Sequence, residues 1–398
     1  MRRSIRIRLV AVFAMFVMTG CTTAPQRQLS TDVSRFVMLP NGQNPLRPGE
    51  LSDVRQDMLA ARRRTIARSA GAPIKLLELS GGGQNGAFGA GVLSGWVERE
   101  GNLDLDLVTG VSTGTLLATF AYLGTQEAIN YISQIYVNVG PEDIYTRRNL
   151  VNVLAGSDSI YDTTPLKELI EKTITQEVLD QVAAEYDKDR RLLCATTNMD
   201  YEQTWVWDLS SIAKHGGPGA LELYRAVVRA SASPPIMFPP VEINGSLFAD
   251  GGTRHNLLLG GLLDDIGMGN ADETTERLHA EIYVIMNNGG YQKRTAVRDD
   301  IKHLIPRSIN MMVAVSSADS VLRAYFIAKS HGFDFNLVSI PKDVHIGDNS
   351  MAFDHEVMQR IYQAGITLGR NGSWQHQPPP TDEMASWFIQ DVAKDLSD

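Results

Sequence analysis

From residue 74 onward, short apolar runs alternate with stretches of helical spacing, and this alternation constrains the fold more than any other feature. The apolar runs have the length of buried strands. They occupy residues 74–79, 103–111, 191–197, 204–209, 280–286 and 333–340. Helical spacing is seen at residues 87–98, 115–123, 164–188, 220–232, 307–330 and 351–368. Strands that alternate with helices through short links predict an α/β fold, with a mostly parallel central sheet flanked by helices on both faces.

The composition narrows the class of function. Of the 398 residues two are cysteines, which excludes a disulfide-stapled scaffold and a four-cysteine zinc site. The chain carries 37 basic and 46 acidic residues, and after residue 10 no basic run exceeds the three arginines at 62–64, so nucleic acid is not the expected partner. Its Asp and His residues form no cluster with metal-ligand spacing, and no metal or other cofactor is expected.

The first 21 residues have the features of a secretory leader. Four arginines lie among the first eight residues, and an apolar run follows at residues 9–18. As a helix this run rises about 15 Å, half of what a bilayer core requires. The segment from Met18 to Cys21 resembles a bacterial lipoprotein signal, in which the cysteine is acylated, and Thr22 then favours the outer membrane of the cell envelope. The alternative is a plain secretory signal with an incidental Cys21.

This leader sets the expected organisation of the chain. Residues 1–20 are predicted to be a signal peptide and residues 21–70 a lipidated tether or arm, because residues 22–52 mix Pro, Gln, Ser, Thr and Gly. Residues 71–375 form the expected catalytic domain, and residues 376–398 a Pro-rich spacer with a C-terminal helix. Since the body is acidic, the acylated Cys21 would supply membrane proximity.

The first candidate catalytic element is a Gly-x-Ser-x-Gly pentapeptide, in which Gly110 and Gly114 flank Ser112. It lies between a predicted strand and a predicted helix, which is the context that this motif requires. The two glycines permit a sharp, strained turn that exposes the serine hydroxyl as a nucleophile. A tight turn with a helix-capping serine is the alternative interpretation.

The second element is a glycine-rich loop between a predicted strand and a predicted helix. Its backbone N–H groups can converge on an anion, and the helix N-terminus adds positive potential. The loop contains Gly81, Gly82, Gly83, Gln84, Asn85 and Gly86. A phosphate loop requires a Lys that is missing here, and the dinucleotide pattern is also missing. With a nucleophile candidate in the chain, the loop is predicted to be an oxyanion hole.

The third element is Asp250, followed by Gly251 and Gly252 at the end of a predicted hairpin that turns at residues 244–245. Alone, such a triplet is usually a turn, but here an acid at a strand end could hold or act as a base. None of the eight histidines lies in a distinctive motif, and His255 is the nearest to Asp250 in sequence. Cys194 is predicted to be a buried thiol without a catalytic role.

In this order, the three elements resemble the patatin-like phospholipase family. Segments 79–93, 161–166 and 229–252 are similar to its sequence blocks. The resemblance implies a three-layer α/β/α fold and a Ser-Asp dyad, with Ser112 as nucleophile and Asp250 as general base. It assigns the oxyanion hole to residues 81–86 and requires no metal or cofactor. The family usually has Arg or Lys where this chain has Asn85, which puts rate and substrate preference in question.

The function expected from these residues is a membrane-anchored serine lipid acyl hydrolase that acts on phospholipid or another acyl ester. Three alternatives stay open. The first is a lipoprotein that binds a lipid or a partner without catalysis. The second is a Ser-His-Asp lipase that would use His345 or His355, and the third is an acyltransferase. The apolar helical region after residue 305 could line an acyl groove, although core packing is the commoner role of such residues.

Overall fold

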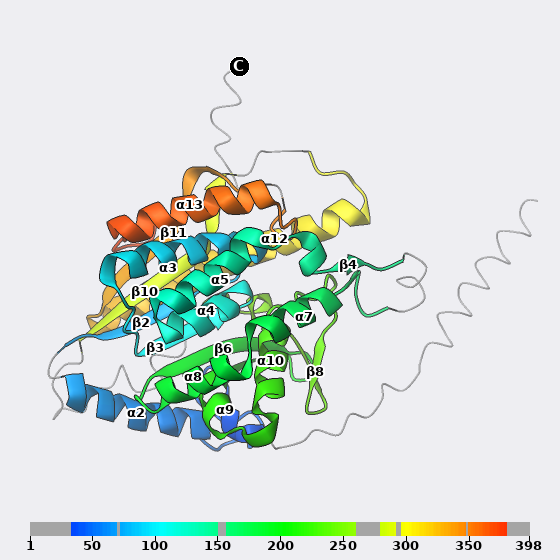
Figure 1. Ribbon diagram of the computed structural model, residues 1–398. Coiled ribbons are helices and arrows are strands. Elements are labelled where there is room, and N and C mark those ends of the chain that lie inside the picture. The colour runs from blue at the N-terminus through cyan, green and yellow to red at the C-terminus, as the bar shows by residue number, and fades with distance from the viewer. Residues whose placement is uncertain are drawn as a thin grey trace, which may run out of the picture.

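The computed structural model describes residues 33–69, 72–149, 157–259, 279–291, 296–347 and 349–379. A sheet forms the middle layer, and helices cover both of its faces (Figure 1). This arrangement confirms the three-layer α/β/α fold predicted from the sequence. Within these ranges, no helix combines the length and the apolar character needed to cross a membrane.

The described residues form a nine-stranded sheet. Along its main path the strands follow the order β1 (Val37–Met38), β7 (Gln203–Asp208), β6 (Arg191–Asn198), β3 (Leu107–Val111), β2 (Ile74–Leu79), β10 (Ala280–Tyr291) and β11 (Asp334–His345). Strands β8 (Val241–Ile243) and β9 (Ser246–Asp250) form a hairpin. The hairpin joins the sheet through β9, which pairs with β6. Strands β6, β3, β2, β10 and β11 run parallel to one another, whereas β6 pairs antiparallel with β7 and β9. The carboxyl ends of the parallel strands therefore meet at one edge of the sheet, where ligands bind in such folds.

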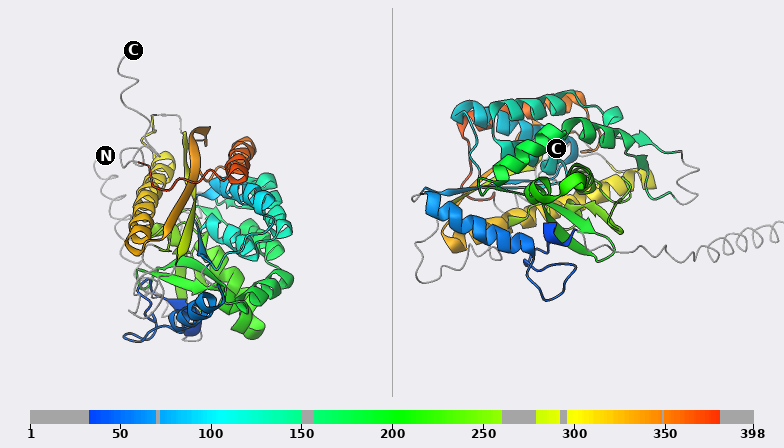
Figure 2. Two further views of the ribbon diagram at one scale, coloured as in Figure 1. Left: turned by 90° about the vertical axis from the view of Figure 1, so that its left-hand side faces the viewer. Right: turned by 60° about the horizontal axis from the view of Figure 1, so that its bottom comes forward.

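Side chains of the parallel strands alternate between two apolar cores, as the two-residue period of a strand requires. In β2, Leu77 and Leu79 pack into one core, whereas Ile74 and Leu76 pack into the other. Helices cover the first core: α3 (Gly86–Glu100), α4 (Thr113–Leu123), α5 (Gln126–Asn138), α7 (Thr164–Thr173), α8 (Gln176–Tyr186), α9 (Leu209–His215), α10 (Ala220–Ser231) and α13 (His355–Asn371). The second core lies beneath α2 (Asp53–Ser69) and α12 (Ile301–His331), on the opposite face of the sheet (Figure 2).

Helices α3 and α13 approach each other closely enough for their backbones to touch. A Cβ atom added to Gly91 or Gly95 of α3 would lie 2.1 or 2.2 Å from a carbonyl oxygen of α13. Gly365 and Gly369 of α13 face α3 in the same way, at 2.3 and 2.2 Å from its carbonyl oxygens. Since α3 begins directly after the glycine-rich loop, α13 helps to fix the position of that loop.

Two regions differ from the sequence prediction. Helical spacing over 164–188 predicted one helix that Thr164 caps, but the structure has two, α7 and α8. The prediction was wrong because the side chain of Thr175 accepts a hydrogen bond from Val178 N and begins a second helix. Likewise, Thr163 occupies the N-cap position of α7, so Thr164 is its first helical residue.

The second difference concerns the arm predicted over residues 21–70. In the described part of this arm, β1 pairs antiparallel with β7 and its side chains are buried. Val54 and Met58 of α2 pack into the second core. Residues 33–69 are therefore an integral layer of the body rather than a loose tether. The predicted signal peptide, Cys21 and the helix expected over 382–396 lie outside the described residues.

Candidate active site

Ser112 lies at the turn between β3 and α4, with φ 55° and ψ −129°. A non-glycine residue rarely adopts a positive φ, and such strain is typical of functional turns. The flanking glycines are required by space: a Cβ atom at Gly110 would lie 2.5 Å from the carbonyl oxygen of Gly114. One at Gly114 would lie 2.3 Å from the carbonyl oxygen of Leu79. The backbone thus turns tightly against β2 and presents the serine hydroxyl at the carboxyl edge of the sheet.

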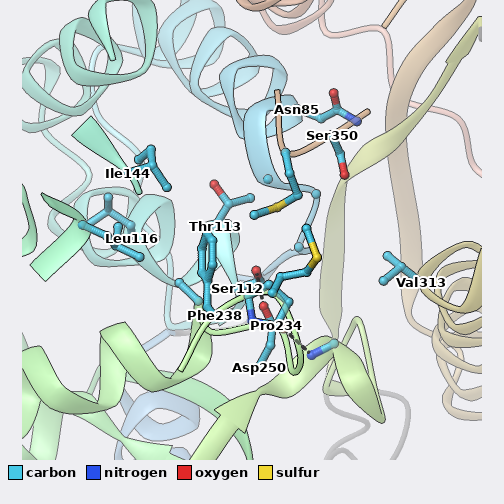
Figure 3. Close-up of a pocket in the computed structure, with 18 of the residues that line it drawn as sticks. Asn85, Ser112, Thr113, Leu116, Ile144, Pro234, Phe238, Asp250, Val313 and Ser350 are labelled. Atoms are coloured by element: carbon cyan, nitrogen blue, oxygen red, sulfur yellow. Dashed lines mark hydrogen bonds between the residues drawn. The ribbon is translucent and has the colours of Figure 1, made fainter. Parts of the chain in front are cut away.

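Asp250 meets this hydroxyl from the end of β9. The Oγ atom of Ser112 donates a hydrogen bond to Oδ2 of Asp250 over 2.6 Å, and Figure 3 shows the two side chains pointing toward each other. The other carboxylate oxygen, Oδ1, accepts a hydrogen bond of 2.7 Å from the N–H of Gly252. A Cβ atom at Gly251 would lie 2.6 Å from the carbonyl oxygen of Ala195, so the turn after Asp250 also requires glycine.

Burial changes the acid–base character of Asp250. Removal of the carboxyl from water raises its pKa to about 7, while hydrogen bonds from Ser112 and Gly252 oppose this shift. A carboxylate with this pKa is a stronger base than an exposed one, and near pH 7 about half of it is ionised. The pair can therefore transfer the serine proton directly to Asp250.

The raised pKa predicts a pH-dependent stability. Because the pKa of Asp250 is higher in the folded protein than its ordinary value of 3.8, its contribution to the free energy of unfolding is present at low pH and is lost as pH rises to about 7. Asp250→Asn should remove this loss. Between about pH 5 and about pH 8, the wild type should lose on the order of 3 kcal/mol more than the variant. Urea unfolding of both proteins at the two pH values measures the difference, and equal losses would contradict the raised pKa.

The glycine-rich loop lies directly against Ser112. A Cβ atom at Gly81 would be 2.9 Å from the Cβ of Ser112. Gly82 and Gly83 have φ values of 158° and 57°, and Cβ atoms there would lie 2.6 Å from the carbonyl oxygen of Asn287 and 2.4 Å from that of Ser350. The loop is thus enclosed by backbone on both sides, and its shape depends on these glycines.

Hydrogen bonding distinguishes among the six predicted oxyanion donors. The N–H of Gly81 donates to Oδ1 of Asn256, and that of Gln84 donates to the carbonyl of Ser350, both over 2.8 Å. The N–H groups of Asn85 and Gly86 donate to carbonyls within the loop itself. In the part of the chain that the structure describes, no acceptor meets the N–H groups of Gly82 and Gly83. These two are therefore available to an oxygen of a ligand.

Two asparagines that the sequence analysis did not single out hold this loop. Asn256 accepts the hydrogen bond from Gly81. Asn287 lies in β10, directly after the residues that pair in regular register with β11. Its side chain donates to the carbonyl of Ser80 over 2.7 Å and accepts from the N–H of Gly89 over 3.0 Å. Asn256 could have been suspected, because it lies in the loop after Asp250. For Asn287, the only sequence signal is its position at the end of a predicted buried strand.

Asn85, at the position where the related family usually has a cation, is buried beside the cavity. Its Oδ1 atom has no hydrogen-bond partner among the described residues. The side chain lines the cavity that contains Ser112 and is seen above it in Figure 3. An unpaired buried oxygen can accept a hydrogen bond from a ligand, which a Lys or Arg in this place could not do.

Hydroxyl groups support the serine turn from beneath. Oγ of Ser231 accepts a hydrogen bond of 3.0 Å from the N–H of Ser112 and donates one of 2.8 Å to the carbonyl of Ala195. Thr115 joins them through an O–O contact of 2.9 Å and lies 3.4 Å from the sulfur of Cys194. Burial raises the pKa of Cys194 to about 12, so it stays a neutral thiol, as predicted from its apolar surroundings.

Ser112 and Asp250 open into a cavity of about 260 Å³. Its walls are mainly apolar side chains from α4, α5, α7, α10 and the loops beside them. They include Leu116, Ile135, Val139, Ile144, Leu166, Leu169, Ile170, Val228, Met237 and Phe238. Among the α12 side chains that the structure describes, Val313 lines this cavity, while Val321 packs into the second core. The described apolar lining comes mostly from other helices, and the acyl groove suggested for the region after residue 305 stays a prediction.

No described histidine lines this cavity. The ring of His255 pairs with Oγ1 of Thr204 over 2.9 Å, away from the Ser112–Asp250 hydrogen bond. His355 is the first residue of α13 and does not line the cavity. In the described ranges, no three His, Cys, Asp or Glu residues lie together as metal ligands.

Comparison with known proteins identifies a family that the chain resembles. Residues 77–263 match the family model described as patatin-like phospholipase, so this segment of the chain is similar to that family. The family is one of lipid acyl hydrolases of the phospholipase type. The matched segment contains Ser112, Asp250 and the whole glycine-rich loop.

Individual relatives are distant. The chain is 26% identical over 301 residues to the uncharacterized protein R571 of Acanthamoeba polyphaga mimivirus, which covers 74% of this chain and 91% of that protein. VipD from Legionella pneumophila is 14% identical with a TM-score of 0.34, over 76% of this chain and 67% of VipD. ExoU from Pseudomonas aeruginosa, solved in complex with SpcU, is 15% identical with a TM-score of 0.31, over 65% of this chain and 53% of ExoU.

Proposed function

We propose that this protein is a serine acyl hydrolase of membrane phospholipid that acts through a Ser112–Asp250 dyad. The observation that carries the proposal is the hydrogen bond of 2.6 Å between a serine on a strained turn and a buried carboxylate. Both groups face an apolar cavity that suits an acyl chain. A protein that only binds lipid has no need of this strained arrangement.

The residues suggest a reaction in two steps. Asp250 accepts the proton of Ser112 as Oγ attacks the ester carbonyl carbon, and the negative charge on the carbonyl oxygen is stabilised by the N–H groups of Gly82 and Gly83. Asp250 then gives the proton to the departing alcohol, which leaves an acyl-enzyme. In the second step Asp250 takes a proton from water, the resulting hydroxide releases the fatty acid, and Ser112 recovers its proton.

The cavity supports an acyl ester as the substrate class more firmly than any particular head group. Its apolar lining offers a favourable environment to one hydrocarbon chain. Beside the glycine-rich loop, Asn85 replaces the cation usual in the family, so a phosphate near this position would meet a neutral amide and form no ion pair with it. Water as the acceptor gives a hydrolase, and another alcohol as the acceptor would give an acyltransferase.

The membrane location is part of the proposal. Acylation of Cys21 would fasten the body to the bacterial envelope, most naturally to the outer membrane. The described body begins at Val33, and the segment between them can reach at most about 40 Å when fully extended. An anchored enzyme would therefore stay within reach of phospholipid in its own membrane. Mass analysis of the N-terminal peptide of the mature protein tests for the acyl groups.

Labelling with a fluorophosphonate tests the activated serine. Such a reagent reacts with an activated serine by displacement of fluoride, and we expect one adduct, which peptide mapping assigns to Ser112. Asp250→Asn should form the adduct at least about a hundredfold more slowly, because the base is lost while the fold is kept. A folded wild type that forms no adduct would favour the alternative of a lipid-binding or partner-binding lipoprotein. An adduct on another residue would show that Ser112 is not the nucleophile.

A further inference from the structure

Ile236 combines two unfavourable features in one residue. Its φ is 72°, in the left-handed region, which a β-branched residue rarely adopts. Its side chain is 53% exposed, whereas the next two residues, Met237 and Phe238, are 3% and 2% exposed. The loop thus buries the side chains of Met237 and Phe238 but turns that of Ile236 outward, where it is not stabilised by packing in the core.

Hydrogen bonds hold the strained conformation in place. The N–H of Phe238 donates to the carbonyl of Pro234 over 2.9 Å, closing the loop. The carbonyls of Ile236 and Met237 accept hydrogen bonds from the N–H groups of Ile160 and Tyr161, each over 3.0 Å. Glycine or asparagine would fit this backbone with less strain. The position therefore keeps an apolar side chain that its backbone does not favour.

Ile236 marks the mouth of the catalytic cavity. Together with Pro234 and Phe238, which are labelled in Figure 3, it lines the cavity that contains Ser112. Because Ile236 is also half-exposed, the apolar surface continues from the cavity to the outside of the protein through this residue. A hydrocarbon chain that enters the cavity could therefore contact Ile236 on its way.

The charged side chains of the ribbon beside the mouth are of both signs. The loop is bonded to the two-stranded ribbon of β4 (Thr146–Arg147) and β5 (Tyr161–Asp162). Arg148, next to this ribbon, lies 3.2 Å from a carboxylate oxygen of Asp158 and 3.6 Å from one of Asp162. With the exposed Arg147 of β4, two arginines and two aspartates lie here, so the ribbon presents no excess of positive charge to anionic lipid. Apolar contact is then the feature that a partner could recognise.

We propose that Ile236 inserts into the hydrocarbon of a zwitterionic lipid surface and thereby places the cavity mouth against the substrate. The inference rests on the proposed function, because an acyl chain must leave a lipid assembly to reach Ser112. Contact at Ile236 removes the exposed apolar side chain from water and keeps the path of the acyl chain apolar. The strained backbone and the exposed side chain of Ile236 then bring a benefit only when the protein is bound to lipid.

An environment-sensitive dye at position 236 tests the contact. The full chain would carry Ser112→Ala, to prevent hydrolysis, and Ile236→Cys labelled with the dye, with peptide mapping to verify the single site. Phe326→Cys is the matched control, because Phe326 is 64% exposed but lies about 20 Å along α12 from the cavity-lining Val313. With phosphatidylcholine vesicles, we expect the dye emission to shift to shorter wavelength at 236 and not at 326.

Each other result would overturn the inference. These results are equal shifts at the two positions, no shift at 236 in protein that sediments with the vesicles, and no sedimentation at all. A dye at 236 that shifts only with a protein partner would indicate a protein-docking site instead. Because the labelled protein is catalytically silent, this assay decides the lipid contact even if the wild type hydrolyses no ester.

Kinetics supply the second measurement. Ile236→Asn should lower the ratio of the rate on phosphatidylcholine vesicles to the rate on a dispersed short-chain ester by about tenfold. Ile236→Leu should preserve the ratio, and so should the control Phe326→Asn. Since asparagine relieves backbone strain, the thermal stability of Ile236→Asn should not fall. Equal loss on both esters would show a role inside the site and contradict lipid insertion.

Discussion

Asp250→Asn should lower kcat for ester hydrolysis by about a thousandfold or more, because the amide cannot accept the proton of Ser112. Its Oδ1 can still accept the hydrogen bond from Gly252, so the turn should keep its shape. The measurement is kcat on a dispersed ester, with circular dichroism to establish that the variant is folded. The wild-type rate should be half-maximal near pH 7 and level off about one pH unit higher, because the base must be ionised and burial places its pKa at about 7.

Two further substitutions serve as references for this prediction. Ser112→Ala sets the background rate without the nucleophile. His255→Gln should keep most of the activity, since the His255 ring pairs with Thr204 and not with the dyad. If Asp250→Asn retains a tenth of the wild-type rate, or if His255→Gln loses as much as it does, the dyad mechanism is wrong and a histidine base must be sought.

The second large effect is expected at the glycine-rich loop. Gly83→Val should reduce kcat by roughly a hundredfold to a thousandfold, the range expected for loss of an oxyanion donor. The added Cβ would lie 2.4 Å from the carbonyl oxygen of Ser350, so the loop must shift and its N–H groups would move away from the reacting oxygen. The measurement compares kcat for the variant and the wild type at equal amounts of folded protein.

Backbone strain must be separated from this displacement. Gly217→Val is the matched control, because Gly217 has a φ of 64°, close to the 57° of Gly83, but no atom within 4 Å of an added Cβ. Both variants should lose stability by a similar mechanism, and only Gly83→Val should lose turnover. Similar turnover in the two variants would argue against an oxyanion role for the loop around Gly83.

The sequence located the residues of the site better than their individual hydrogen bonds. Ser112 and Asp250 lie in short motifs whose glycines restrict the backbone, so their identity is local information. The choice of Gly82 and Gly83 as free donors is not local, because it depends on Asn256 and on the carbonyl of Ser350, which occupy the neighbouring N–H groups. A sequence motif does not show contacts between segments as far apart in the chain as this loop and Ser350.

The same distinction applies to the fold. Buried strands such as β2 and β3 were predicted because their apolar runs are continuous, and the hairpin of β8 and β9 because Asn244 and Gly245 both accept positive φ. The two-residue strand β1 has no periodicity of its own. It is buried because β7 offers a free edge, and such pairing depends on tertiary structure rather than on local propensity.

The close packing of α3 against α13 has a consequence for how the domain is delimited. The family match ends at residue 263, yet the carbonyl of Ser350 contacts the glycine-rich loop and the backbone of α13 packs against α3, both from beyond that limit. The motif-bearing segment is therefore not an autonomous module. An exchange of residues 77–263 between relatives would transfer the nucleophile and the base. The geometry of the oxyanion loop would then depend on the C-terminal residues of the recipient protein.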